Sequence, residues 1–145
     1  MLGGCLCGAV RYDYEGALGG ELGAVTLCHC TACRKAQGYA VAAAPALSAG
    51  FRLIAGAERV REYESSPGKK RGFCGVCGSP LYSRRDSAPA TIRLRLGSLD
   101  DPPSELRIEA HIHMRDVPAW TEPDFAPRYP GEEPGRGLAP EGASV

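Results

Sequence analysis

The chain has 145 residues, with 17 Lys and Arg side chains balanced by 17 Asp and Glu side chains. This length is typical of one domain with a modest core. The balanced charge gives no indication of nucleic acid or a membrane surface as a partner, and no apolar run approaches the roughly 20 residues of a membrane-spanning helix.

Turn residues recur at short intervals and long helical periodicity is absent, which predicts a mostly β domain with little helix. Apolar and charged residues alternate over 10–14, which indicates a half-buried strand, and a second strand is expected over 23–28. A short helical turn capped by Thr31 and ended by Gly38 should follow. A buried strand over 39–44, stopped by Pro45, completes this half.

The rest of the chain continues as short strands. Segments 51–54 and 60–63 are expected to be strands joined across Gly56, and segments 71–73 and 81–83 to form a hairpin. Segment 91–96 alternates most clearly, with Ile92, Leu94 and Leu96 on one face and Arg93 and Arg95 on the other. A turn over 100–103 precedes a last strand over 108–112.

A composition change marks the end of the predicted domain. From about Pro130 the chain consists mainly of Gly, Pro and Glu and has almost no apolar residues. Such a segment cannot bury enough apolar surface to fold. We therefore expect a domain over residues 1–129 and a disordered tail over 130–145.

The cysteines are the main functional signal. All seven fall into three tight groups, Cys5-Leu-Cys7, Cys28-His-Cys30-Thr-Ala-Cys33 and Cys74-Gly-Val-Cys77. Two groups offer two thiols and the middle group offers three, which matches one site with four thiolates and one with three. Structural zinc is closed by four protein ligands, whereas catalytic zinc keeps a position for water or substrate. The pattern therefore predicts two zinc ions per chain.

The two outer pairs fit the closed site. Cys5 and Cys7 point to the same side of an extended segment. Gly75 and Gly78 permit the positive-φ turn that wraps a backbone around a metal between Cys74 and Cys77. Metal binding there would clamp the N-terminal segment to a distant hairpin and would be part of folding. We expect these four cysteines to build the fold and to do no chemistry.

The middle group leaves an open site. Cys28 and Cys30 share a strand face and Cys33 returns from the following turn, so the fourth zinc position could accept water or a thiol whose pKa the ion would lower. His29 points away by alternation, so packing or hydrogen bonding at the rim is expected of it rather than ligation. Two alternatives stay open. A distant His or a partner could close the group into a second structural site, or the thiols could be reduced and metal-free.

Two further imidazoles and several basic side chains could also take part in the chemistry. His111 and His113 share one strand face, and we expect a structural or surface role, although they are the first candidates for proton transfer near the open site. Several basic residues between or just after the cysteine groups fit a solvated sheet face, or the capture of an anionic small molecule such as a peptide carboxylate. They are Arg59, Arg61, Lys69, Lys70, Arg71, Arg84 and Arg85.

The cysteines also bear on the cellular compartment. The start of the chain lacks the basic and apolar regions of a secretory signal. In a reducing compartment, cysteines are more often metal ligands or catalytic groups than disulfides. A secreted disulfide framework would leave one thiol over and would not explain why every thiol has a near neighbour in sequence. We expect a cytoplasmic protein, and nothing in the sequence indicates its oligomeric state.

At these residues the chain resembles a known family. Five motifs occur in the order found in the glutathione-dependent formaldehyde-activating enzyme family, over about residues 3–129. They are Gly4-Cys-Leu-Cys-Gly-Ala-Val-Arg-Tyr12, Cys28-His-Cys-Thr-Ala-Cys-Arg-Lys35 with Gly38, Phe73-Cys-Gly-Val-Cys-Gly-Ser79, Gly97-Ser-Leu-Asp-Asp101 and His111-Ile112. The resemblance implies an Mss4-like fold of small β-sheets pinned by zinc. It also implies the same division of ligands, with Cys5, Cys7, Cys74 and Cys77 on the structural ion and Cys28, Cys30 and Cys33 on the second.

The resemblance implies an activity as well. The family joins formaldehyde to the thiol of glutathione to give S-hydroxymethylglutathione, and is classed as a carbon–sulfur lyase in the reverse direction. The expectation is therefore an enzyme that adds a small thiol to an aldehyde at the second zinc. The alternatives are a non-enzymatic zinc module for a protein partner, a role the Mss4-like fold has elsewhere, and a thiol-based redox or metal sensor.

Overall fold

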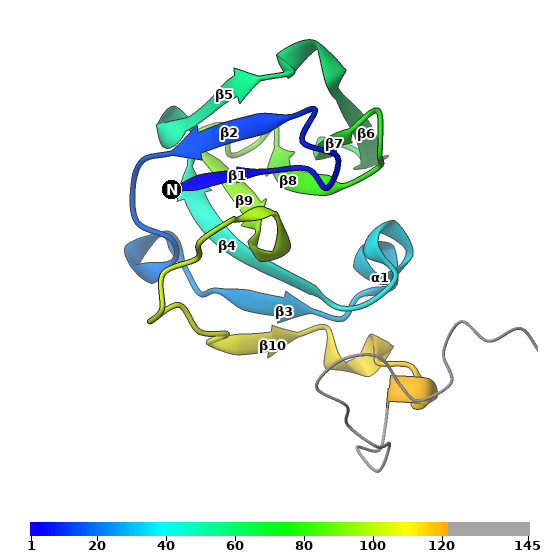
Figure 1. Ribbon diagram of the computed structural model, residues 1–145. Helices are drawn as coiled ribbons and strands as arrows, with labels where there is room; N and C mark the ends of the chain where they lie inside the picture. The colour runs from blue at the N-terminus through cyan, green and yellow to red at the C-terminus, as the bar shows by residue number, and fades with distance from the viewer. Residues whose placement is uncertain (122–145) are drawn as a thin grey trace, which may run out of the picture.

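The computed structural model describes residues 1–121 (Figure 1). The tail predicted over 130–145 and the end of the predicted domain lie outside the described residues. Within residues 1–121, no helix is long and apolar enough to cross a bilayer.

Two β-sheets make up the described part of the chain (Figure 1). The smaller sheet has the order β1-β2-β5 and consists of β1 (Leu2–Gly4), β2 (Arg11–Tyr14) and β5 (Phe51–Ala55). The larger sheet has the order β10-β3-β4-β9-β8-β7-β6. Its strands are β3 (Thr26–Cys28), β4 (Val41–Leu47), β6 (Val60–Ser66), β7 (Lys69–Cys74), β8 (Pro80–Arg85), β9 (Thr91–Arg95) and β10 (Ala110–Ile112). Neighbouring strands are antiparallel except β10 and β3, which run parallel.

Helical structure is short throughout residues 1–121. The α-helix α1 spans Thr31–Gln37. Single 3-10 turns are η1 (Gly20–Leu22), η2 (Ser48–Gly50), η3 (Ala57–Arg59), η4 (Leu96–Ser98), η5 (Met114–Asp116) and η6 (Ala119–Thr121). The predicted fold class, mostly β with little helix, is confirmed.

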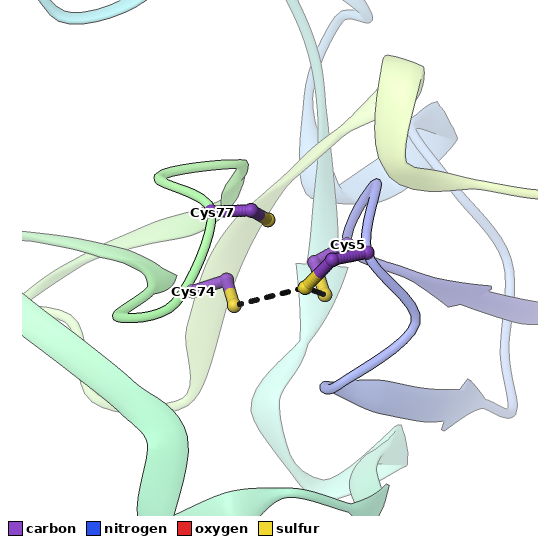
Figure 2. Close-up of side chains that lie close together, drawn as sticks. Cys5, Cys74 and Cys77 are labelled. Atoms are coloured by element: carbon purple, nitrogen blue, oxygen red, sulfur yellow. Dashed lines mark hydrogen bonds between the residues drawn. The ribbon is translucent and has the colours of Figure 1, made fainter.

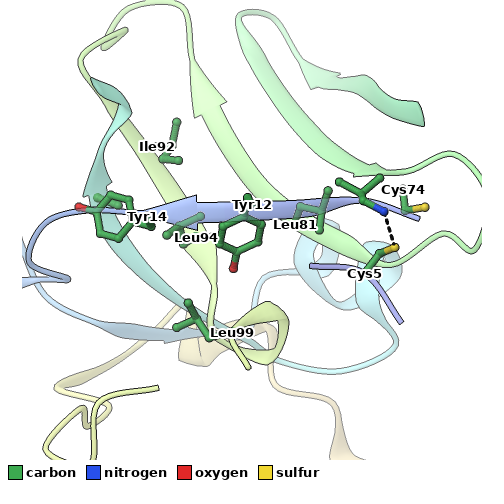
Figure 3. Close-up of a cluster of buried hydrophobic side chains, with 10 residues drawn as sticks. Cys5, Tyr12, Tyr14, Cys74, Leu81, Ile92, Leu94 and Leu99 are labelled. Atoms are coloured by element: carbon green, nitrogen blue, oxygen red, sulfur yellow. Dashed lines mark hydrogen bonds between the residues drawn. The ribbon is translucent and has the colours of Figure 1, made fainter. Parts of the chain in front are cut away.

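The core lies between the two sheets (Figure 3). Tyr12 of β2 is fully buried, and its hydroxyl lies 2.8 Å from Ser98 Oγ. Because the Ser98 hydroxyl donates to the carbonyl of Arg95 at 2.7 Å, Tyr12 is the donor in this pair. Leu94 of β9 packs in the same cluster from the opposite sheet. The hydrogen bond between Tyr12 and Ser98 joins the small sheet to the turn that follows β9.

Two sequence expectations about local structure are wrong. Pro45 does not stop β4, which continues to Leu47 with Pro45 opposite Arg93 of β9. β3 pairs with β4 no further than Ala43, so at Pro45 the edge facing away from β9 has no strand partner and a backbone N–H is not needed there. The carbonyl of Pro45, which points to the same edge, accepts a hydrogen bond from Gly19 N at 3.0 Å.

The second correction concerns the start of α1. Its N-cap is Cys30, not Thr31, because Cys30 Sγ accepts from Cys33 N at 3.4 Å. A sulfur therefore satisfies a backbone donor that a hydroxyl usually takes. Gly38 ends the helix in the left-handed conformation, in line with the expectation.

Candidate metal centres

The four cysteines of the two outer pairs converge where the β1–β2 loop meets the β7–β8 hairpin (Figure 2). Their Sγ atoms all lie within 4.8 Å of one another. Cys7 Sγ is 3.5 Å from Cys5 Sγ and 4.0 Å from Cys74 Sγ. Four sulfurs at tetrahedral positions around one zinc lie about 3.8 Å apart. The group therefore fits a single tetrahedral ion, and all seven cysteines of the chain are free thiols.

Backbone amides in both loops point at these sulfurs. Val10 N donates to Cys5 Sγ at 3.2 Å, and Val76 N donates to Cys74 Sγ at 3.4 Å. Gly78 has a φ of 78° and closes the second loop through its N–H to the carbonyl of Cys74. Such donors stabilise sulfur in the thiolate form that a metal needs.

Ser79 joins the two loops, a role that the sequence motif did not reveal. Its Oγ accepts from Leu6 N at 3.0 Å, which leaves its own proton for Cys77 Sγ at 3.2 Å. Hydrogen bonds from Ser79 lower the pKa of Cys77 to about 5. A residue of the second loop thus positions the first loop and favours a thiolate at the shared site.

The expectation that Gly75 adopts a positive φ is wrong, since the positive φ in this turn belongs to Gly78. Gly75 N donates to the carbonyl of Arg59 at 2.7 Å. A Cβ on Gly75 would lie 3.0 Å from that carbonyl oxygen and 2.9 Å from Arg61 Cγ. Glycine is required there for close approach of the loop to β6, not for an unusual dihedral angle.

The middle cysteine group forms a second, separate cluster. Cys28 ends β3, Cys30 caps α1, and Cys33 lies in the first turn of the helix. The three Sγ atoms lie within 4.8 Å of one another, and within residues 1–121 no His, Asp or Glu joins them as a fourth ligand. Arg71 Nη1 donates to Cys33 Sγ at 3.7 Å.

The electrostatics of this cluster favour a bound cation. Burial alone would raise the pKa of Cys33, but the Arg71 guanidinium and the neighbouring thiols outweigh it and lower the pKa. Burial raises the pKa of Cys28, and the neighbouring thiols of Cys33 and Cys30 raise it further. Thiols this close cannot all ionise without a positive charge among them. A divalent ion would supply that charge, so the donor set fits zinc with one coordination position left over.

The three histidines divide into a pair and a single residue. His29 Nε2 lies 3.1 Å from His111 Nδ1, and the two rings stack with centroids 5.3 Å apart. His29 therefore contacts β10 and does not join the sulfur cluster. His113 lines the cavity beside the three cysteines. Its φ of 60° is the one positive value at a non-glycine residue within 1–121.

A cavity of about 360 Å³ opens onto the middle cysteine group. Three of the basic residues named from the sequence line this cavity: Lys69, Arg71 and Arg85. Arg93 and Arg95 also line it, and neither was singled out from the sequence. Their alternation with core residues of β9 was visible in the sequence. The pairing of β9 with β8, and of β8 with β7, was needed to show that the cations gather on one face.

The chain matches one family model and is similar to a solved structure. The model of a family described as glutathione-dependent formaldehyde-activating enzyme matches residues 1–116, a range that contains every cysteine and His113. A crystal structure of a Rhodobacter sphaeroides protein, a structural genomics target, is similar with a TM-score of 0.59 and 28% sequence identity. The match covers 72% of this chain and 92% of that one. No curated protein gives a significant match.

The four-sulfur group leads to a first prediction. Cys77 is exposed, so Cys77→Ser removes little packing. We expect it to lower the free energy of unfolding by more than about 2 kcal/mol, because ligand loss weakens metal binding that is coupled to folding. Chemical denaturation with zinc present measures this change. Val76→Ala, in the same loop and 59% exposed, is the control and should change stability by less than about 0.5 kcal/mol. Equal small effects would contradict a structural ion at this group.

Lys69 leads to a second prediction. Burial and the neighbouring charges of Arg85 and Arg95 lower the pKa of Lys69 to about 8. Lys69 therefore binds a proton more readily in the unfolded chain than in the folded one. The resulting loss of folding stability is fully present below pH 8, and it disappears as the pH rises towards the ordinary lysine pKa. We expect Lys69→Met to raise the melting temperature by on the order of 2 °C at neutral pH, with a smaller gain at about pH 9.5.

Lys70 provides the matched control for this change. It lies next in sequence and pairs with Asp86 at 3.2 Å, so Lys70→Met should bring no gain at either pH. A pH-independent gain in the Lys69 variant would show that added apolar surface, not relief of repulsion, is the cause.

Proposed function

Since the chain belongs to the glutathione-dependent formaldehyde-activating enzyme family, we propose that it is a zinc-dependent enzyme of the carbon–sulfur lyase type. Its substrates would be a small thiol and formaldehyde or another small aldehyde. The reaction would take place at Cys28, Cys30 and Cys33. The observation that carries this proposal is a cluster of three sulfurs, without a fourth ligand in residues 1–121, that opens onto a cavity.

The two cysteine groups would have different tasks. Cys5, Cys7, Cys74 and Cys77 would hold a structural zinc, and the middle group a second one. Zinc held by three thiolates supplies an open position at which an incoming thiol loses its proton. Free thiols of this kind persist in a reducing compartment, which supports a cytoplasmic location.

Residues of the chain would assist the addition at two points. Arg71 donates to Cys33 Sγ and so helps to hold negative charge on the sulfurs. The substrate thiolate would attack the carbonyl carbon, a carbon–sulfur bond would form, and the carbonyl π electrons would move to oxygen. That oxygen needs a proton, and His113 lines the same cavity and can donate one. The product would be a hydroxyalkyl thioether, and the reverse steps would release the aldehyde.

A spectroscopic titration tests the open site. In protein loaded with cobalt in place of zinc, 2-mercaptoethanol should change the visible absorption bands because it enters the coordination shell of one ion. Cys33→Ser, which disrupts the middle group, should show no such response. An unchanged spectrum of the wild-type protein at saturating thiol would contradict an open coordination position and, with it, the proposed reaction.

The proton-donor role of His113 gives a further prediction. His113→Asn removes the imidazole but tolerates the left-handed backbone conformation found there. We expect kcat for thiol addition to formaldehyde to fall about 100-fold with little change in KM. His111→Gln is the control, because His111 contacts His29 outside the cavity lining. If both variants keep full activity, the proton comes from water.

A further inference from the structure

The wall of the cavity is a sheet face with cations on three consecutive strands. Lys69 and Arg71 of β7 lie two residues apart and so share a face, as do Arg93 and Arg95 of β9. Lys69 stands opposite Arg85 of β8, while Ser83 of β8 stands opposite both Arg71 and Arg93. Strand pairing thus places all five cations on the face that lines the cavity.

No carboxylate within residues 1–121 balances this face. The described residues that line the cavity include no Asp or Glu. Within residues 1–121, the ion pairs involve the N-terminus, Arg11, Arg52, Arg59, Lys70 and Arg84, and none of the five cations. The contrast along one strand is direct, since Arg84 pairs with Glu62 at 2.6 Å while Arg85 has no ion pair within the part of the chain that the structure describes. Like charges opposite one another destabilise a sheet, so the arrangement calls for a bound anion.

Two of these cations are fixed, Arg95 by burial and Arg93 by hydrogen bonds. Arg95 is only 5% exposed, and burial lowers its pKa to about 10. Arg93 Nη2 donates to Thr26 Oγ1 at 2.7 Å and to the carbonyl of Ala43 at 3.2 Å, which orients its guanidinium. Buried cations are unfavourable unless an opposite charge accompanies them. The buried Arg95 therefore favours an anionic ligand, and the hydrogen bonds of Arg93 fix its guanidinium before a ligand binds.

The metal centre alone cannot supply that opposite charge. Three thiolates with one divalent zinc carry a single net negative charge, and Arg71 already contacts Cys33. Lys69, Arg85 and Arg93, further along the same face, have no anionic partner among the described residues. A ligand that fills the cavity would need more than one negative charge. Among the lining residues that the structure describes, it would find no carboxylate to receive an ammonium group.

We propose that the thiol substrate is a compact dianion without an ammonium group, such as a thiol that bears two carboxylates. This inference rests on the proposed function. The thiol lies at the cysteine group, the anionic oxygens contact Lys69, Arg85 and Arg93, and Arg71 lies between the two regions. A zwitterionic thiol such as glutathione satisfies this surface less well, because its ammonium group has no carboxylate acceptor among the described lining residues.

Binding of matched probes to the zinc-loaded full chain tests the inference. Mercaptosuccinate carries a thiol and two carboxylates, whereas cysteamine carries a thiol and an ammonium group. By calorimetry, mercaptosuccinate should bind at least about tenfold more tightly than cysteamine, and more tightly than glutathione. Equal affinities for mercaptosuccinate and cysteamine would overturn the inference.

Neighbouring variants separate the cavity from general surface charge. Arg85→Gln should reduce the preference for mercaptosuccinate severalfold, because Arg85 is exposed at the cavity and its loss needs no repacking. Arg84→Gln removes the same charge from the opposite face of β8 and should leave the preference unchanged. Equal effects of the two variants would show that net charge, not this site, selects the ligand.

Succinate and inorganic phosphate distinguish the anion site from the thiol chemistry. Both anions lack a thiol, and we expect one or both to compete with mercaptosuccinate for the cavity. The stronger competitor shows which kind of dianion the cations prefer. If neither competes, the anion site is refuted. If all thiols change the cobalt spectrum equally, the proposed function stands and the dianion preference fails. If succinate competes but no thiol changes that spectrum, the anion site stands and the proposed function fails.

Discussion

The structure depends on the meeting of four sulfurs from two segments that are far apart in sequence. Cys5 and Cys74 are buried members of the main hydrophobic cluster, while Cys7 and Cys77 complete the group from the exposed side. The same loops are joined by Ser79, so sulfur ligation and hydrogen bonding act on one junction. A metal ion held at this junction would contribute directly to the free energy of folding, which matters for a core of this size.

Apolar and basic side chains alternate along β9, so the two faces of the large sheet have different surroundings. Ile92 and Leu94 enter the core between the sheets, while Arg93 and Arg95 enter the cavity. The three-sulfur group lies at one side of that cavity, on β3 and α1. In the proposed account this arrangement separates structure from chemistry: one face and one cysteine group would stabilise the fold, and the other face and group would receive a ligand.

The division of the cysteines could be read from their spacing, because pairs and triplets of thiols have few ways to complete a tetrahedral ion. The strands of the hairpin around Cys74 and the alternation of β9 were also predictable from local pattern. Features that depend on long-range pairing were not. Pro45 is tolerated because β3 does not extend alongside it, and the cationic face exists only through the register of three strands.

The unequal sharing of sulfur between two ions is tested most directly by counting zinc in Cys33→Ser beside the wild-type chain, with circular dichroism on the same samples. Two ions per chain in the wild type, one in the variant, and unchanged β-sheet spectra are the expected results. Loss of both ions with unfolding of the variant, or retention of both, would contradict a closed structural centre that is independent of an open one.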